Sequence, residues 1–266
     1  MLSKYQQKLC QLNNNFIRAG FSTHSHPKFD IQRAADRSII LTPKLAPHKY
    51  SLIWLHGLGD SAAGFVDVFL DENFNLVPKN CKVLLLTAPQ REVTLNDGMM
   101  MNSWYDISNI RGGRPKSMDE LYPKYNQEQL MESVDIVTKH IESEIKLVGQ
   151  SKQIFLGGFS QGCALALATF LKYDKLLGGI IGLSGMNALK FDLNNAPLYE
   201  EKKNTPIFLY HGEADNMINY HVAQLSYKEV FDQKFNANLT LESGMEHTLS
   251  EKELRLLQKF IHNQMP

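Results

Sequence analysis

The chain of 266 residues has few cysteines, no net charge and no long hydrophobic run. Its three cysteines are widely spaced and form no Cys-x-x-Cys pair, which disfavours a disulfide scaffold and a cysteine zinc site. The 28 basic and 28 acidic residues balance, which argues against nucleic acid as a partner. Apolar runs such as residues 83–86 are far shorter than the roughly 20 residues of a membrane-spanning helix. The composition therefore predicts an ordinary globular enzyme without a transmembrane span.

Acidic residues are absent from positions 1–29, and this segment differs from the rest of the chain. Its four basic residues leave 24 basic and 28 acidic residues, a net charge of −4, in residues 30–266. Apolar residues recur in it at the spacing of one helical face: Leu2, Tyr5, Leu9, Leu12 and Phe16. A basic, amphipathic, acid-free N-terminus is typical of a mitochondrial transit peptide. The alternative is a cytoplasmic protein whose N-terminal helix lies on the surface or contacts an assembly partner.

Residues 30–266 alternate short apolar segments with helical patterns, and no linker divides them into separate domains. Strand-like segments are 50–55, 81–86, 154–156, 179–183, 206–210 and 238–241. Helical periodicity covers 126–147 and 163–172, and Ser250 and Glu253 form a candidate capping box before a C-terminal helix. This alternation predicts one α/β domain with a mostly parallel sheet and helices on both faces. The polar stretches 107–124 and 186–204 are expected to be surface loops.

One pentapeptide carries the strongest chemical signal. Gly158-Phe-Ser160-Gln-Gly162 matches Gly-x-Ser-x-Gly, with a predicted strand before it and a predicted helix after it. In that context the turn is so sharp that it presents the serine oxygen above the sheet. The alternative is a tight connection with a serine that merely faces solvent. The flanking strand and helix favour Ser160 as a nucleophile.

A serine nucleophile needs a general base, and the base needs an orienting acid. In this fold class the acid and then the histidine follow the serine, each after a later strand. Asp215 follows the strand that ends at Tyr210, and His247 follows the strand that ends at Leu241. Glu213 is an alternative acid. His56 and His211 also end strands, but they precede glycine turns and are expected to bind nearby backbone groups.

Two backbone N–H groups are expected to form an oxyanion hole. One belongs to Gln161, directly after the serine, and the other to Leu58 in the glycine-containing loop 56–60. The glycines are not followed by Gly-Lys-[Ser/Thr], which excludes a Walker phosphate loop. No His-Glu-x-x-His motif occurs, and carboxylates do not cluster with histidines, so we predict neither a metal site nor a cofactor.

The motifs described above fall within a larger set of six short blocks of sequence: residues 56–61, 87–89, 103–106, 157–162, 211–215 and 244–247. In this order they resemble acyl-protein thioesterases and lysophospholipase-like carboxylesterases of the α/β-hydrolase superfamily. The resemblance spans Tyr50 to the C-terminus. It implies an α/β-hydrolase fold and hydrolysis of an acylated protein or lipid ester without a cofactor. It assigns Ser160, Asp215 and His247 as nucleophile, acid and base, and favours Leu58 and Gln161 as oxyanion donors.

An acyl chain requires an apolar slot, and one short segment offers side chains for its wall: Met99, Met100, Met101 and Trp104. The alternative is that this run packs its own loop. Two positions depart from the family pattern, since Cys163 replaces a small glycine and Asn216 a common proline. Cys163 is either a redox-sensitive thiol or, as we favour, a buried packing residue. A second hypothesis for the whole chain is an accessory subunit of a larger assembly with lost activity.

Overall fold

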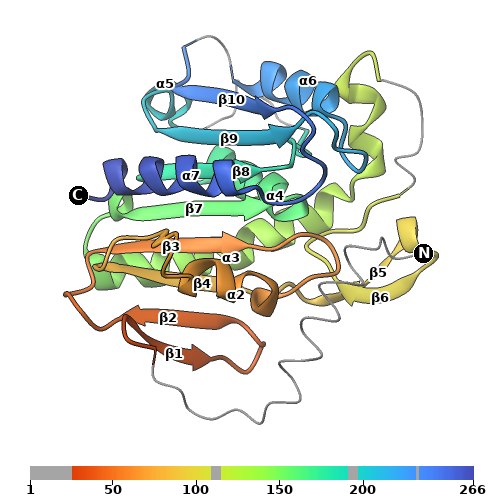
Figure 1. The fold of residues 1–266 in the computed structure, drawn as a ribbon. Coiled ribbons are helices and arrows are strands. Elements are labelled where there is room, and N and C mark those ends of the chain that lie inside the picture. Colours follow the sequence, from red (N-terminus) through yellow and green to blue (C-terminus); the bar gives the residue numbers. More distant parts are fainter. Residues whose placement is uncertain (1–25, 109–114, 191–196, 232–233) are drawn as a thin grey trace.

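The computed structural model describes residues 26–108, 115–190, 197–231 and 234–266. An eight-stranded sheet in the order β1-β2-β4-β3-β7-β8-β9-β10 forms its centre (Figure 1). The strands are β1 (Phe29–Arg33), β2 (Ile39–Pro43), β3 (Tyr50–Leu55), β4 (Cys81–Leu86), β7 (Ile154–Phe159), β8 (Gly179–Leu183), β9 (Ile207–Gly212) and β10 (Ala237–Glu242). The six strands from β4 to β10 pair in parallel, and β1 and β2 extend the sheet antiparallel.

Helices cover both faces of this sheet. The helices are α2 (Ala62–Leu70), α3 (Gln127–Val148), α4 (Gln161–Lys172), the short α5 (Tyr199–Lys202), α6 (Tyr220–Val230) and α7 (Glu251–Gln264). In Figure 1, α2 and α7 lie in front of the sheet, and α3 and α4 lie behind it. Buried side chains form one hydrophobic cluster with α3, α4 and α6 and a second with α2 and α7.

Strand β3 shows why the sequence produces two apolar layers. Its residues alternate, so that Leu52 and Trp54 pack on the α2 and α7 side while Ile53 and Leu55 pack on the α3 and α4 side. A parallel strand buried on both faces therefore reads as a continuous apolar run. The predictions of a single α/β domain, a mostly parallel sheet and helices on both faces are confirmed. The capping box of Ser250 and Glu253 is also confirmed.

The structure adds several elements that the sequence pattern did not reveal. These are β1, β2, α2, α6 and a hairpin of β5 (Gln90–Val93) and β6 (Met99–Asn102). Their apolar signals are short; in β1, for example, only Phe29 is buried. The expectation that 107–124 and 186–204 are surface loops is wrong in part. Met118 and Leu121 are buried in the core, as is the run 186–189, because isolated apolar residues in polar segments pack over the helices.

Candidate active site

Ser160 occupies the turn that joins β7 to α4. Its backbone has a positive φ of 56° with ψ −117°, a strained conformation for a residue with a side chain. The flanking glycines are required for close packing. A Cβ on Gly158 would lie 2.4 Å from the carbonyl carbon of Gly162, and one on Gly162 would lie 2.1 Å from the Leu55 oxygen. The predicted strand-turn-helix context of Ser160 is therefore present.

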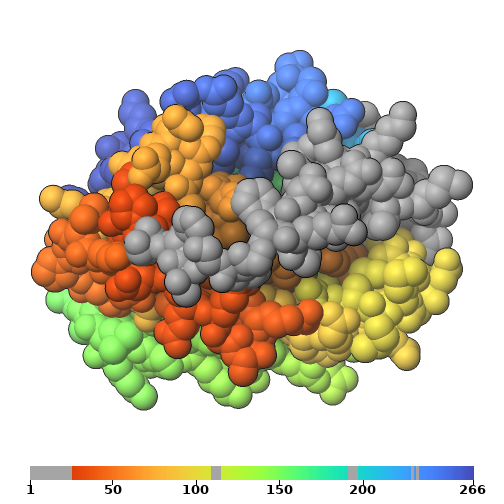
Figure 2. All heavy atoms as spheres, turned by 60° about the horizontal axis from the view of Figure 1, so that its bottom comes forward, coloured from red at the N-terminus to blue at the C-terminus, as the bar shows by residue number. Residues whose placement is uncertain are grey.

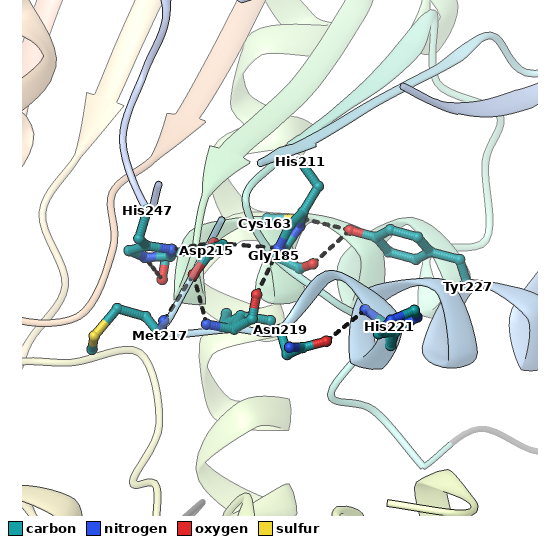
Figure 3. Close-up of polar contacts among 11 residues, drawn as sticks. Cys163, Gly185, His211, Asp215, Met217, Asn219, His221, Tyr227 and His247 are labelled. Atoms are coloured by element: carbon teal, nitrogen blue, oxygen red, sulfur yellow. Dashed lines mark hydrogen bonds and ion pairs between the residues drawn. The ribbon is translucent and has the colours of Figure 1, made fainter. Parts of the chain in front are cut away.

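A continuous hydrogen-bond chain links Ser160, His247 and Asp215. His247 Nε2 lies 2.9 Å from Ser160 Oγ, and His247 Nδ1 lies 2.7 Å from Asp215 Oδ2. Figure 3 shows His247 and Asp215 facing each other, although they belong to loops after different strands. Because a carboxylate accepts, Nδ1 carries the proton and Nε2 is free to accept the serine proton. The other oxygen of Asp215 accepts 2.8 Å hydrogen bonds from the backbone N–H groups of Met217 and Ile218.

The environment of Asp215 keeps this carboxyl ionised. Its side chain is fully buried, and burial alone raises its pKa. Hydrogen bonds from His211 and His247 outweigh the effect of burial and hold the pKa well below its usual value. The alternative acid, Glu213, is exposed to solvent. Asp215 is therefore positioned to orient the His247 ring and to stabilise its protonated form.

The rival histidines bind backbone groups, as expected. His56 Nδ1 lies 2.7 Å from the Gly57 oxygen, and the Ala88 N–H donates to His56 Nε2 at 3.0 Å. Burial lowers the pKa of His56 to about 4, so this ring is neutral. His211 Nε2 donates to the Ile218 oxygen at 2.7 Å and lies 3.3 Å from Asp215 Oδ2. Both rings shape the loops around the serine.

Two backbone N–H groups beside Ser160 are available to a ligand. Among the residues that the structure describes, the N–H groups of Leu58 and Gln161 have no acceptor. Gly57 brings the Leu58 loop against the serine, because a Cβ on Gly57 would lie 3.2 Å from Ser160 Cβ. Gln161 is the first residue of α4, where the helix dipole also favours negative charge. This arrangement suits an oxyanion.

The Gln161 side chain has a role that the sequence did not suggest. It is buried, accepts a 2.9 Å hydrogen bond from the Trp104 N–H, and donates to the Tyr105 oxygen at 2.7 Å and to Ser103 Oγ at 3.1 Å. Residues 103–106, one of the six blocks that resemble the family, are therefore hydrogen-bonded to the residue that directly follows Ser160. The sequence indicated this block, but it did not indicate that the block binds the Gln161 side chain.

The four residues expected to line an acyl slot lie in different environments. Met99 and Met100 on β6 are 64% and 55% exposed. Met101 is half-buried, with its sulfur 3.7 Å from the position of a Cβ on Gly59. Trp104 is fully buried, and its Nε1 donates to the His56 oxygen at 2.9 Å. Trp104 thus holds the start of the loop that contains Leu58, through its hydrogen bond to His56. A role of these four residues in acyl binding stays a prediction.

Cys163 is buried beneath the turn. Its sulfur lies 3.7 Å from the Tyr227 hydroxyl, which donates to the Gly185 oxygen at 2.8 Å (Figure 3). A Cβ on Gly185 would lie 2.4 Å from Cys163 Cβ, so the glycine makes room for the larger residue. Burial raises the pKa of the Cys163 thiol to about 12. These contacts favour the packing interpretation over a redox thiol.

The described residues contain neither a cluster of metal-binding side chains nor a membrane-spanning helix. No group of three or more His, Cys, Asp and Glu side chains in them is arranged to hold a metal ion. Nor does any helix in this part of the chain have the length and apolar character needed to cross a membrane. The predicted leader falls almost entirely on residues 1–25, outside the described ranges.

Comparison with known proteins decides the family. The family model described as phospholipase/carboxylesterase matches residues 36–265. The chain belongs to this family. Acyl-protein thioesterase 1 of Yarrowia lipolytica is 36% identical over 216 residues, covering 80% of this chain and 90% of the relative. Acyl-protein thioesterase 1 homolog 1 of Dictyostelium discoideum is 33% identical, covering 84% and 94%.

Solved structures agree with the sequence relatives. The crystal structure of Arabidopsis thaliana SOBER1 is 30% identical and superposes with a TM-score of 0.68, covering 82% of this chain and 99% of that one. SOBER1 is a carboxylesterase by name. The expected α/β-hydrolase fold and family are thereby confirmed, and the chain is a serine hydrolase of the class that cleaves esters or thioesters.

Proposed function

We propose that this family member hydrolyses acyl thioesters and oxyesters through an acyl-enzyme on Ser160, with His247 as general base and Asp215 as orienting acid. The observation that carries the proposal is the hydrogen-bond chain from Ser160 Oγ through both nitrogens of His247 to Asp215. The N–H groups of Leu58 and Gln161 complete the set as oxyanion donors. Together these groups supply a nucleophile, a base and stabilisation of the developing charge.

The proposed reaction has two halves. Ser160 Oγ attacks the acyl carbonyl carbon as its proton moves to His247 Nε2, and the carbonyl oxygen becomes an oxyanion facing Leu58 and Gln161. The tetrahedral species collapses, the bond to the leaving group breaks, and His247 returns the proton to that group. Water then gives a proton to His247, attacks the acyl-enzyme carbonyl and releases the acid, which regenerates Ser160. Asp215 stays ionised throughout and stabilises the imidazolium.

The leaving group decides which substrates the site serves. A thiol, with a pKa of about 8.5, needs less proton donation than an alcohol, so the same site accommodates thioesters and oxyesters. The relatives named acyl-protein thioesterase favour an acylated protein as substrate. A lysophospholipid is the second candidate, supported by the phospholipase/carboxylesterase family match. Met99, Met100 and Met101 are proposed to contact the acyl chain, because flexible thioether side chains adapt to it.

A substrate panel tests the proposal. The purified full chain is assayed on an S-acylated peptide, a lysophospholipid and a short aryl ester, alongside Ser160→Ala. We expect the acylated peptide to give the highest kcat/KM and the variant to lose all three activities. Retention of hydrolysis by Ser160→Ala would refute the nucleophile assignment. A preference for lysophospholipid would transfer the substrate assignment to lipid esters.

Residues 1–29 are proposed to be a mitochondrial leader preceding a catalytic domain of 30–266. The support is the acid-free, basic, amphipathic pattern of the segment. N-terminal sequencing of the protein from fractionated cells tests this, since a cytoplasmic protein that begins at Met1 contradicts it. The accessory-subunit hypothesis is less favoured, because the relatives above are named for hydrolytic activities. Native mass measurement tests it, and a monomer would refute an assembly.

A further inference from the structure

Asn102, the last residue of β6, contacts the Leu58 loop through both its backbone and its side chain. Its backbone oxygen accepts a 2.9 Å hydrogen bond from the Gly59 N–H, and its side-chain Nδ2 donates to the Asp60 oxygen at 2.6 Å. The Asp60 N–H is itself bonded to the Gly57 oxygen at 3.2 Å. Asn102 therefore holds the Leu58–Gly59 and Asp60–Ser61 peptide units, which lie directly C-terminal to Leu58.

The other end of the Asn102 side chain is held as well. Its Oδ1 accepts a 2.9 Å hydrogen bond from Arg37 Nη2 and a second from Gln90 Nε2. Because Oδ1 accepts from two donors, the amide cannot flip without losing both bonds and the Asp60 bond together. The side chain is buried, with 8% of its surface exposed. Arg37 and Gln90, which do not belong to the Leu58 loop, thus set the orientation of Asn102 Nδ2 toward that loop.

Arg37 connects this contact to a distant part of the chain. It lies in the turn between β1 and β2, and its own carbonyl oxygen accepts a 3.0 Å hydrogen bond from Thr87 Oγ1 at the end of β4. Figure 2 shows the N-terminal strands, in red, beside the yellow residues around the β5–β6 hairpin. A path of hydrogen bonds therefore runs from the β1–β2 turn through Asn102 to the Leu58 loop.

We infer that Asn102 is a positioning residue for the oxyanion hole, holding the Leu58 N–H in line with Ser160, and that Arg37 locks Asn102 in place. The inference rests on the proposed function, because it concerns the same site. An N–H that stabilises an oxyanion must point at the oxygen's position in the transition state, and small displacements of such a group are costly. Asn102 contributes no group to the substrate itself.

The test is Asn102→Asp, which keeps the size of the side chain and its acceptors for Arg37 and Gln90 but removes the donor to Asp60. The matched control is Asn96→Asp, the same chemical change in the connection between β5 and β6, where Nδ2 donates to the Met101 sulfur. We expect Asn102→Asp to lower kcat by roughly 10- to 100-fold with KM within about twofold, since the loss resembles a misaligned oxyanion donor. The control keeps kcat within about twofold because it leaves the Leu58 loop intact.

A boronic acid that forms a tetrahedral adduct separates positioning from simple loss of structure. Its affinity for Asn102→Asp should fall in parallel with kcat, whereas the affinity of a non-reactive fatty acid product should not. If Asn102→Asp does not fold, Arg37→Ala replaces it, since Arg37 is exposed and its loss frees Oδ1 from one donor. We expect a several-fold fall in kcat and in boronate affinity for that variant.

Unchanged kcat and boronate affinity in folded Asn102→Asp, or in Arg37→Ala if it alone folds, would overturn the inference. An equal loss in Asn96→Asp would do the same. Ser160→Ala distinguishes this failure from a failure of the proposed function. If Ser160→Ala is inactive while Asn102→Asp is normal, only the positioning role is lost; if Ser160→Ala is active, the proposed function itself is wrong.

Discussion

Two regions of this molecule contain the same three kinds of side chain, yet only one has a catalytic order. Each has a serine, a histidine and a buried carboxylate: Ser160, His247 and Asp215 after the strand ends, and Ser51, His48 and Glu144 near the start of β3. In the first, the imidazole lies between the serine and the acid. In the second, the serine lies between them, with Ser51 Oγ 2.8 Å from His48 Nε2 and donating to Glu144 Oε2 at 2.7 Å.

This difference in order determines what the serine can do. The only proton of Ser51 goes to Glu144, so His48 must donate to Ser51 Oγ and cannot act as its base. Lys82 Nζ also lies 2.5 Å from Glu144 and neutralises the carboxylate. Ser51 is in a regular strand and fully buried, whereas Ser160 sits on a strained turn with partial exposure. Residue types alone therefore do not define a triad; the hydrogen-bond order and backbone position do.

Removing each serine gives the largest expected contrast. Ser160→Ala should lower kcat by about 10⁶-fold, because a nucleophile in a triad has no substitute. Ser51→Ala should leave kcat within about twofold but reduce the free energy of unfolding by about 1–3 kcal/mol, since Glu144 loses a buried donor. Hydrolysis of an acyl thioester and urea denaturation measure the two effects. A large loss of kcat in Ser51→Ala would show that Ser51 has a catalytic role and would contradict this assignment.

Removing each acid gives the next contrast. Asp215→Asn should lower kcat by about 10⁴-fold, because the amide favours the wrong tautomer of His247. Glu144→Gln leaves Lys82 without its counter-charge, and should cost about 3 kcal/mol of folding free energy with kcat unchanged. Steady-state kinetics and denaturation distinguish the two variants. Comparable kinetics in both would mean that Asp215 does not orient His247.

A third buried carboxylate, Glu253, differs from both, because no histidine or lysine in the described part of the chain pairs with it. Burial raises its pKa to about 8, and its Oε1 has no hydrogen-bond partner within the described chain. The unfolded chain ionises this group near pH 4.5, so the fold loses stability as pH rises from 4.5 to about 8, by a few kcal/mol. Glu253→Gln should abolish this loss while keeping the capping box, as urea denaturation at pH 5 and pH 9 would show. Equal pH dependence in the variant contradicts this role.

The pKa of Asp215 shifts on folding in the opposite direction to that of Glu253. Its pKa is lowered on folding, so its contribution to stability is present above the unfolded pKa of 3.8 and is lost as pH falls below it. Asp215→Asn should therefore unfold less steeply in acid than the parent chain. Acid titration followed by tryptophan fluorescence measures this smallest effect, and an unchanged acid transition would contradict it.

Ser160, Asp215 and His247 could be predicted because local sequence patterns mark the strands that precede them. The strands before Ser160 and Asp215 contain continuous apolar runs, and the strand before His247 alternates Leu239 and Leu241 with polar residues. The order serine, acid, histidine along the chain, which is that of a known family, then assigned one residue after each strand. The hydrogen bonds of Asn102 and of the Gln161 side chain could not be predicted in this way. Asn102 lies 42 residues from Asp60, and their contact depends on the short β5–β6 hairpin, which forms a sheet of its own beside the main one. Gln161 likewise reaches a loop 56 to 58 residues away.

The most direct test of the account is a fluorophosphonate probe followed by peptide mapping. The probe forms a covalent bond to an activated serine oxygen, so it reports the hydrogen-bond order and not the mere presence of serine, histidine and acid. We predict one adduct per chain, located on Ser160, lost in Ser160→Ala and retained in Ser51→Ala. An adduct on Ser51, or unchanged labelling of Ser160→Ala, would contradict the assignment of the catalytic serine.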